Sequence, residues 1–290
     1  MKIAWLTDIH LDHTSDEVRS EFYNQIIKSS PSIIIISGDI AEATNFVHYL
    51  IEMADAVQIP IYFVLGNHDY YNGFVDEVRT NASQLNTQHP MLHYLSSLEP
   101  VELSHHTFLV GQDGWADARA GNIEESCIVM NDTRLIRDFQ RAFRTGGSVS
   151  EWFTHLTQKM QELADNDAEA LAKQLQTAID KDAQHIHIVT HIPPFTDSCI
   201  GEDIEKYGCD SIYPYFVSVA MGDVLTRFAQ KYPTVEFTVY CGHTHSPSIY
   251  KPQNNLVIHC EGAKYKEPVI SQIRDIDPDQ LESNSRCYRM

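Results

Sequence analysis

The N-terminal stretch KIAWLTDIH, residues 2–10, decides the fold, because it joins an apolar run directly to a carboxylate and an imidazole. Residues 2–7 have the continuous apolar character of a strand that is buried on both faces, and Asp8 and His10 follow at its end. Burying a charged group is costly unless a partner or a cation compensates it. The stretch therefore predicts a central strand that ends at a site needing Asp8 and His10.

Two similar apolar runs follow, SIIIIS at residues 32–37 and PIYFVL at residues 60–65. Between the three runs, residues 16–28 and 45–57 carry apolar side chains at four-residue spacing, which is typical of helices. Strands that alternate with helices are the pattern of a parallel α/β sheet. We therefore expect the first third of the chain to form such a sheet.

The rest of the chain predicts a second strand-rich half behind a mainly helical stretch. Two helices are expected in that stretch, at residues 151–164 and 169–180, with Ser150 and Asp167 as N-caps. Further helices are expected near 73–87 and 216–230, and strands at 91–96, 100–104, 107–111, 185–190, 235–240, 256–260 and within EPVISQIRDI (267–276). The economical interpretation is one α/β domain over residues 1–290, with a helical insertion or cap at roughly 115–183.

Composition and charge exclude several classes of protein. The chain has 290 residues and a formal net charge of −19, so its surface should repel nucleic acids and anionic membranes. No apolar run approaches the length of a membrane span, and the N-terminus lacks a signal-peptide pattern, so we expect a cytoplasmic protein. The six cysteines form no CxxC pair, which argues against a zinc ribbon or a thioredoxin-type site.

Metal-binding side chains follow five of the predicted buried strands. The carboxyl ends of such strands are where ligands bind in open α/β sheets, so these side chains should converge. A set of oxygen and nitrogen ligands without thiolate favours manganese, iron or zinc over copper(I). The residues are Asp8, His10, Asp39, Asn67, His68, His191, His243 and His245.

A single DxH or HxH pair is weak evidence for a metal site by itself. His185 and His187 have the same HxH spacing, but they begin a predicted strand and are interpreted as structural. The set above differs because all its members fall at strand ends. Gly38, Gly66 and Gly242 precede ligands, as expected where a tight turn or a close backbone approach favours glycine.

The set resembles the motif of the calcineurin-like metallophosphoesterases, DxH, GD, GNH(D/E), a single H and GHxH. The resemblance covers residues 8 to 245 and implies a four-layer αββα sandwich with mixed sheets. It also implies two divalent metal ions, most often Mn²⁺ or iron, with Zn²⁺ as an alternative. The matching segments are Asp8-Ile-His10, Gly38-Asp39, Gly66-Asn67-His68-Asp69, His191 and Gly242-His243-Thr244-His245.

By this resemblance the ligands divide into two sets, which share Asp39 as a bridge. A hydroxide between the metals would attack phosphorus. His68 would then protonate the leaving group as the general acid, and Glu42 would orient it; alternatively, Glu42 is a solvated acid in the first turn of the next helix. The sets are Asp8, His10, Asp39 and His245 for one metal, and Asp39, Asn67, His191 and His243 for the other.

Two positions bear on the substrate. Protein serine/threonine phosphatases of this family carry Arg and Glu where this chain has Ala43 and Asp69. The resemblance therefore favours a phosphodiester or a nucleotide-type small substrate. The alternatives are a phosphomonoesterase or a protein phosphatase, then a nuclease, which the acidic composition opposes, and a non-catalytic metal-binding scaffold.

The insertion supplies candidate contacts for a small phosphate-ester substrate. Arg134, Arg137, Arg141 and Arg144 have the spacing of one helical face, which could hold a phosphate or be a solvated stripe. Trp115 and Arg119 could line a pocket, with Trp115 stacking on a base, or they could simply pack at the sandwich edge.

Overall fold

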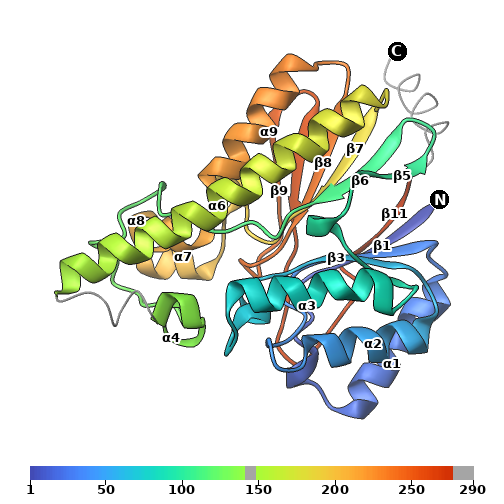
Figure 1. Ribbon diagram of the computed structural model, residues 1–290, viewed down its shortest axis with the longest axis horizontal. Coiled ribbons are helices and arrows are strands. Elements are labelled where there is room, and N and C mark those ends of the chain that lie inside the picture. The colour runs from blue at the N-terminus through green and yellow to red at the C-terminus, as the bar shows by residue number, and fades with distance from the viewer. Residues whose placement is uncertain (141–147, 277–290) are drawn as a thin grey trace.

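The computed structural model describes residues 1–140 and 148–276 and contains two β-sheets packed face to face (Figure 1). The first sheet has the order β11-β1-β2-β3-β4. Strands β1 to β4 are parallel, and β11 pairs antiparallel with β1. The strands are β1 (Lys2–Leu6), β2 (Ile33–Ser37), β3 (Ile61–Val64), β4 (Leu92–Tyr94) and β11 (Gln272–Asp275).

The second sheet has the order β5-β6-β7-β8-β10-β9. Its four inner strands are parallel, and the edge strands β5 and β9 are antiparallel to their neighbours. The strands are β5 (Val101–Ser104), β6 (Thr107–Gly111), β7 (His185–Val189), β8 (Glu236–Cys241), β9 (Ser248–Gln253) and β10 (Leu256–Cys260).

Helices cover the outer face of each sheet, which gives the expected four-layer αββα sandwich (Figure 1). Helices α1 (Asp16–Ser29), α2 (Phe46–Val57) and α3 (Val75–Gln88) cover the first sheet, and α6 (Val149–Asp180) and α9 (Val219–Lys231) cover the second. The short helices α4 (Asp132–Leu135), α7 (Glu202–Tyr207) and α8 (Cys209–Phe216) lie beside the sheets.

The space between the two sheets is filled by apolar and aromatic side chains that are shielded from water. Trp5 of β1 packs edge-on against Tyr240 of β8, with ring centroids 5.0 Å apart. Burial on both faces explains why β1, β2 and β3 read as uninterrupted apolar runs. The two sheets therefore share a core and present their carboxyl ends together.

Helix α6 differs from the expected pair of helices. It runs unbroken through residues 149–180, and its N-cap is Ser148, whose side chain accepts from the Glu151 N–H. Asp167 lies inside it, where its carboxylate accepts from the Gly114 N–H and from Arg79. The expected caps at Ser150 and Asp167 were therefore wrong.

Two hydrophobic cores share helix α6. Leu156, Met160 and Leu163 belong to the core around the first sheet and the insertion. Leu171 and Leu175 belong to the core behind the second sheet. The helical insertion is consequently joined to the sandwich by one continuous element.

The expected arginine-bearing helix is interrupted. Helix α4 ends at Leu135, and Ile136 has an extended backbone, so Arg134 and Arg137 do not lie on one continuous helix. Arg141 and Arg144 lie outside the described residues. No helix within 1–140 and 148–276 is both long and apolar enough to cross a bilayer.

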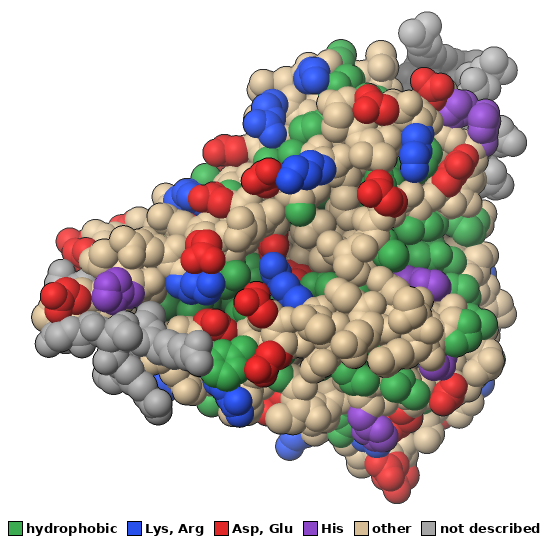
Figure 2. Space-filling model, viewed as in Figure 1, with side chains coloured by type: hydrophobic (Ala, Val, Ile, Leu, Met, Phe, Trp, Pro, Cys, Tyr) green, Lys and Arg blue, Asp and Glu red, His purple; other side chains and the backbone are tan. Residues whose placement is uncertain are grey.

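The charged surface is mixed on the face shown in Figure 2, where acidic and basic side chains are interspersed over both halves of the sandwich. The described residues on that face form no extended basic area (Figure 2).

Candidate metal centre

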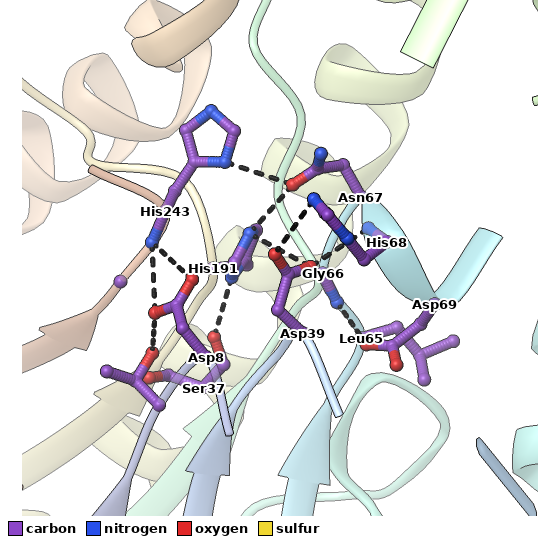
Figure 3. Close-up of polar contacts among 12 residues, drawn as sticks. Asp8, Ser37, Asp39, Leu65, Gly66, Asn67, His68, Asp69, His191 and His243 are labelled. Atoms are coloured by element: carbon purple, nitrogen blue, oxygen red, sulfur yellow. Dashed lines mark hydrogen bonds and ion pairs between the residues drawn. The ribbon is translucent and has the colours of Figure 1, made fainter. Parts of the chain in front are cut away.

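The loops that follow β1, β2, β3, β7 and β8 meet at the carboxyl edge of the two sheets (Figure 3). Backbone hydrogen bonds tie these loops together. Within the first half the Asp8 N–H donates to the Gly38 carbonyl at 3.1 Å. Between the halves the His243 N–H donates to the Asp8 carboxylate at 3.1 Å. The polar residues of the two sequence halves are therefore held in one place.

Five of the expected ligand residues have left-handed backbone conformations. Such conformations cost free energy for residues other than glycine, on the order of 1 kcal/mol or more each, and they persist only where the surrounding structure imposes them. Strain of this kind is concentrated at functional sites. The residues are Asp8 (φ 49°), His10 (φ 38°), Asp39 (φ 54°), His243 (φ 69°) and His245 (φ 52°).

Close approach of the loops explains two of the glycines. A Cβ atom on Gly66 would overlap the Asp39 carboxylate, and one on Gly242 would overlap the Asp8 carboxylate. Any larger residue would have to displace a ligand side chain. The glycines thus allow the loop backbones to lie directly beside the carboxylates.

The first ligand set is compact. One ligand atom from each of its four members lies within 4.8 Å of the others, so the set could hold one metal ion. His245 Nε2 lies 3.3 Å from the nearer Asp8 oxygen, and His10 Nε2 lies 3.7 Å from an Asp39 oxygen. The members are Asp8, His10, Asp39 and His245.

The second set converges on the side-chain oxygen of Asn67 (Figure 3). His191 Nε2 and His243 Nδ1 each lie 3.0 Å from this oxygen, and His191 Nε2 lies 3.4 Å from Asp39 Oδ1. Asp39 therefore contributes one carboxylate oxygen to each side of the centre, which is the arrangement expected of a bridging ligand.

Backbone carbonyls fix the tautomers of both histidines. His191 Nδ1 lies 2.9 Å from the Ser37 carbonyl, and His243 Nε2 lies 3.1 Å from the Tyr215 carbonyl. A carbonyl can only accept, so these nitrogens carry the single proton of each ring, and burial lowers both histidine pKa values. The remaining nitrogens face Asn67 with lone pairs only.

The amide of Asn67 is fixed in the same way. Its NH₂ group donates to Asp132 at 2.9 Å and to the Tyr71 hydroxyl at 3.2 Å, so the oxygen must face the two imidazoles. Acceptors at about 3 Å from one another repel unless a cation lies between them. The donor chemistry of these residues therefore fits a metal ion.

The electrostatics of Asp39, the expected bridging carboxylate, also fit a bound cation. Burial, and then the negative charge of Asp8, raises the pKa of Asp39 well above its ordinary range. Burial also lowers the pKa of His10 to about 2, so this ring is neutral. Two adjacent buried carboxyl groups surrounded by neutral imidazoles form a site that bound cations would stabilise.

A family model describing calcineurin-like phosphoesterases matches residues 1–247 of the chain. The chain belongs to the calcineurin-like phosphoesterase family. A dinuclear metal centre is characteristic of this family, and four residues of this phosphoesterase, Asp8, His10, Asp39 and His245, are grouped closely enough to hold one metal ion.

Solved structures share the fold of this phosphoesterase. A dimetal phosphatase from Danio rerio is 12% identical, with 94% of this chain and 88% of that chain covered and a TM-score of 0.53. The phosphopantetheinyl hydrolase of Mycobacterium tuberculosis is 14% identical, with 96% of each chain covered and a TM-score of 0.62. The protein TT1561 of Thermus thermophilus is 11% identical, with 90% and 88% covered and a TM-score of 0.50. No curated protein matches the sequence.

His68 lies at the rim of the centre of this phosphoesterase. Its side chain is 19% exposed, and its Nε2 lies 3.9 Å from an Asp39 oxygen. Burial lowers the pKa of His68 to about 3. Glu42 bonds elsewhere, because its carboxylate accepts from the Asn72 side chain at 2.8 Å. Its expected orienting contact with His68 is absent from the polar contacts of the described residues, so that role stays a prediction.

Two buried carboxylates brace the ligand loops. Asp69 accepts from the N–H groups of Ile40, Ala41 and Gly66, and burial raises its pKa to about 8. Asp113 accepts from the Leu65 N–H at 2.8 Å through its side chain.

The backbone carbonyl of Asp113 also accepts from the His191 N–H at 2.8 Å. This residue thus links the loop that carries Asn67 to the loop that carries His191. Asp69 also has a structural role, because its carboxylate accepts from three backbone N–H groups. The protein phosphatases of the family carry glutamate at this position, and a side chain longer by a methylene would have to fit the same three donors.

The expected substrate contacts lie in different places, and Trp115 borders the same small cavity as Asn67. Trp115 is only 4% exposed and packs between Tyr70 and Phe139. It borders a cavity of about 10 Å³, which has room for about one water molecule and not for a base. Arg119 pairs with Asp117 and Asp165 at 3.0 and 2.8 Å.

Arg134 and Arg137 lie on the segment just after Asp132. The Arg137 guanidinium lies over the Phe74 ring, 5.3 Å from its centroid. Their roles in substrate binding stay predictions.

Sequence reasoning missed three contributors to the centre. Asp132 comes from the insertion, and no local motif marks it. The carbonyl of Tyr215 belongs to helix α8, and any residue type could supply it. Tyr265 lies beyond the last motif, and its ring centroid is 4.5 Å from that of His10.

Proposed function

We propose that this phosphoesterase hydrolyses a phosphodiester or a nucleotide-type small substrate with two divalent cations. Manganese or iron are the proposed metals, and zinc is the alternative. The observation that carries the proposal is the convergence of acceptor-only atoms on Asn67 beside a carboxylate shared by both ligand sets. When bound, such a pair of cations acidifies water and neutralises charge on phosphoryl oxygens.

The residues of the chain would divide the remaining work. Asp8, Asp39 and Asn67 would hold the cations through oxygen. His68 would supply a proton to the leaving oxygen, because its Nε2 lies beside Asp39 at the rim and is partly open to solvent. The neutral state of His68 that burial favours would have to be reversed by negative charge arriving with the substrate.

A small diester is favoured over a phosphoprotein for two reasons. Ala43 stands where the protein phosphatases of the family carry a phosphate-gripping arginine. Arg119, a candidate on the insertion, is already engaged by two aspartates. A monoesterase remains the alternative that the same centre would support.

The test is turnover of a panel of esters by the protein loaded with Mn²⁺. Bis(p-nitrophenyl) phosphate and cyclic nucleotides represent diesters, and p-nitrophenyl phosphate and nucleoside monophosphates represent monoesters. We expect turnover of diesters, abolished by Asp39→Asn because the shared ligand is lost. Asp55→Asn, the same change on an exposed aspartate of α2, is the matched control. Absence of hydrolysis with Mn²⁺, Fe²⁺ and Zn²⁺ would refute the proposal.

A further inference from the structure

The segment of residues 261–271 connects β10 of the second sheet to β11 of the first sheet. It leaves β10 at Cys260, which is paired with Cys241 beside the ligand loop after β8. It enters β11 at Gln272, which is paired with Trp5 near the end of β1. Both ends of the segment therefore lie at the carboxyl edge where the ligands meet, beyond the residues that the family model covers.

Tyr265 of this segment lies against three histidines of the centre. Its ring centroid is 4.5 Å from that of His10, 5.4 Å from that of His245 and 6.2 Å from that of His68. Its hydroxyl lies 3.4 Å from His68 Nε2. The residue nevertheless remains 45% exposed, so it borders the mouth of the centre instead of filling its interior.

A strained turn holds the tyrosine in this place. The Glu267 N–H donates to the Lys264 carbonyl at 3.2 Å, which closes a turn with Tyr265 and Lys266 at its two central positions. Lys266 has a φ of 70°, a conformation that such turns normally give to glycine. Backbone strain of this kind is concentrated at functional sites, which points to a functional role for the turn.

The turn also carries positive charge in a chain whose formal net charge is −19. Lys264 and Lys266 flank the tyrosine and are exposed. Neither lysine has an ion-pair partner in the part of the chain that the structure describes, whereas Arg119 does. These lysines are therefore free to interact with an incoming anion.

We propose that Tyr265 contacts the substrate, with its hydroxyl donating a hydrogen bond to a phosphoryl oxygen of the ester, and that Lys264 and Lys266 attract the phosphate. This inference rests on the proposed function, because it assumes that a phosphate ester occupies the centre. The hydroxyl lies beside the nitrogen of His68 that would face the leaving oxygen, so both groups can reach the same phosphoryl group. The turn would thus do the work of the arginine that Ala43 replaces.

The experiment measures binding of inorganic phosphate to the full chain loaded with Mn²⁺, by titration calorimetry, in parallel with turnover of bis(p-nitrophenyl) phosphate. Tyr265→Phe keeps the ring on the histidines and removes only the hydroxyl. We expect phosphate affinity and kcat/KM to fall about 10- to 100-fold, the scale of a hydrogen bond to a charged group. Binding of Mn²⁺ and the thermal midpoint should stay unchanged.

Matched variants control for the loss of a hydroxyl or a charge. Tyr232 precedes β8, at the edge of the sheet opposite the metal centre, and its hydroxyl donates to the Gln176 side chain. Tyr232→Phe removes this hydroxyl and should leave phosphate affinity unchanged. Lys264→Gln and Lys266→Gln should each weaken phosphate binding by roughly two- to fivefold at low salt. Lys173→Gln on α6 is the control for those changes.

The outcomes separate the two proposals. Wild-type protein that binds phosphate but hydrolyses no ester would refute the proposed function and leave the Tyr265 comparison decisive. Equal phosphate affinities for wild type and Tyr265→Phe, or no phosphate binding by the wild type, would overturn the inference. A loss seen only in Tyr265→Ala, or a parallel loss of Mn²⁺ binding in Tyr265→Phe, would also overturn it, because each would assign the residue to packing.

Discussion

Replacing Asp132 by alanine should weaken the metal site that contains Asn67, although Asp132 is not a ligand. The same Asp132 oxygen accepts from the Asn67 amide at 2.9 Å and from the Tyr71 hydroxyl at 2.7 Å. Without this acceptor the amide can rotate, so its oxygen no longer has to face His191 and His243. The perturbation therefore acts on the orientation of a ligand while every ligand atom is retained.

The size of the effect follows from the hydrogen bonds that are lost. Two donors would be left without their acceptor, at about 1–3 kcal/mol each, and part of this cost appears as lower stability of the protein without metal. Removing a group that orients a ligand typically lowers metal affinity about 10- to 100-fold. We therefore expect the Mn²⁺ dissociation constant of the site that contains Asn67 to rise by that factor in Asp132→Ala.

Titration calorimetry with Mn²⁺ measures both dissociation constants, and electron paramagnetic resonance reports whether two ions are magnetically coupled. Asp132→Asn keeps a carbonyl acceptor in the same place and should recover most of the affinity. If Asp132→Ala binds two ions with wild-type affinity, the orienting role of Asp132 is wrong.

Three further predictions concern the acid, the core and the loops. His68→Ala should slow hydrolysis of alkyl esters by about 10²-fold or more and of nitrophenyl esters much less, since only the poor leaving group needs a proton; equal losses would remove His68 as the acid. Burial, with the nearby Arg274 charge, lowers the pKa of His185 to about 4. Below about pH 6.5 His185 is protonated in the unfolded state but stays neutral in the folded state down to about pH 4. The free energy of unfolding should therefore fall by about 3 kcal/mol between about pH 7 and pH 4. Urea titrations of His185→Gln should show a shallower dependence, and an unchanged slope would contradict this. Gly242→Ala should lower Mn²⁺ affinity in calorimetry, because its Cβ would displace the Asp8 carboxylate; wild-type affinity would count against that overlap.

Much of the fold, and the convergence of the candidate ligand residues, could be predicted because the information is local. Buried parallel strands such as β2 appear as apolar runs, and a ligand such as Asp39 directly follows its strand. The positions of the two sheets relative to each other then bring distant strand ends together.

The remaining features depend on contacts between segments far apart in the chain. Asp167 has the residue type of an N-cap, but α6 continues through it because Arg79 and the Gly114 N–H satisfy its carboxylate. Asp132 and Tyr265 gain their places at the centre from the path of the insertion and of the segment after β10. Nothing in their neighbouring residues encodes that path.

The sharing of α6 between two cores has a consequence for the folding of the molecule. Separating the insertion from the first sheet would expose Leu156 and Met160, and the same rod continues into the layer behind β6 and β7 through Leu171 and Leu175. Packing of the C-terminal half of α6 behind the second sheet therefore opposes local unfolding of its N-terminal half. Amides along the whole rod should exchange with solvent deuterium at similar rates, as one cooperative unit that opens only when the sandwich itself comes apart.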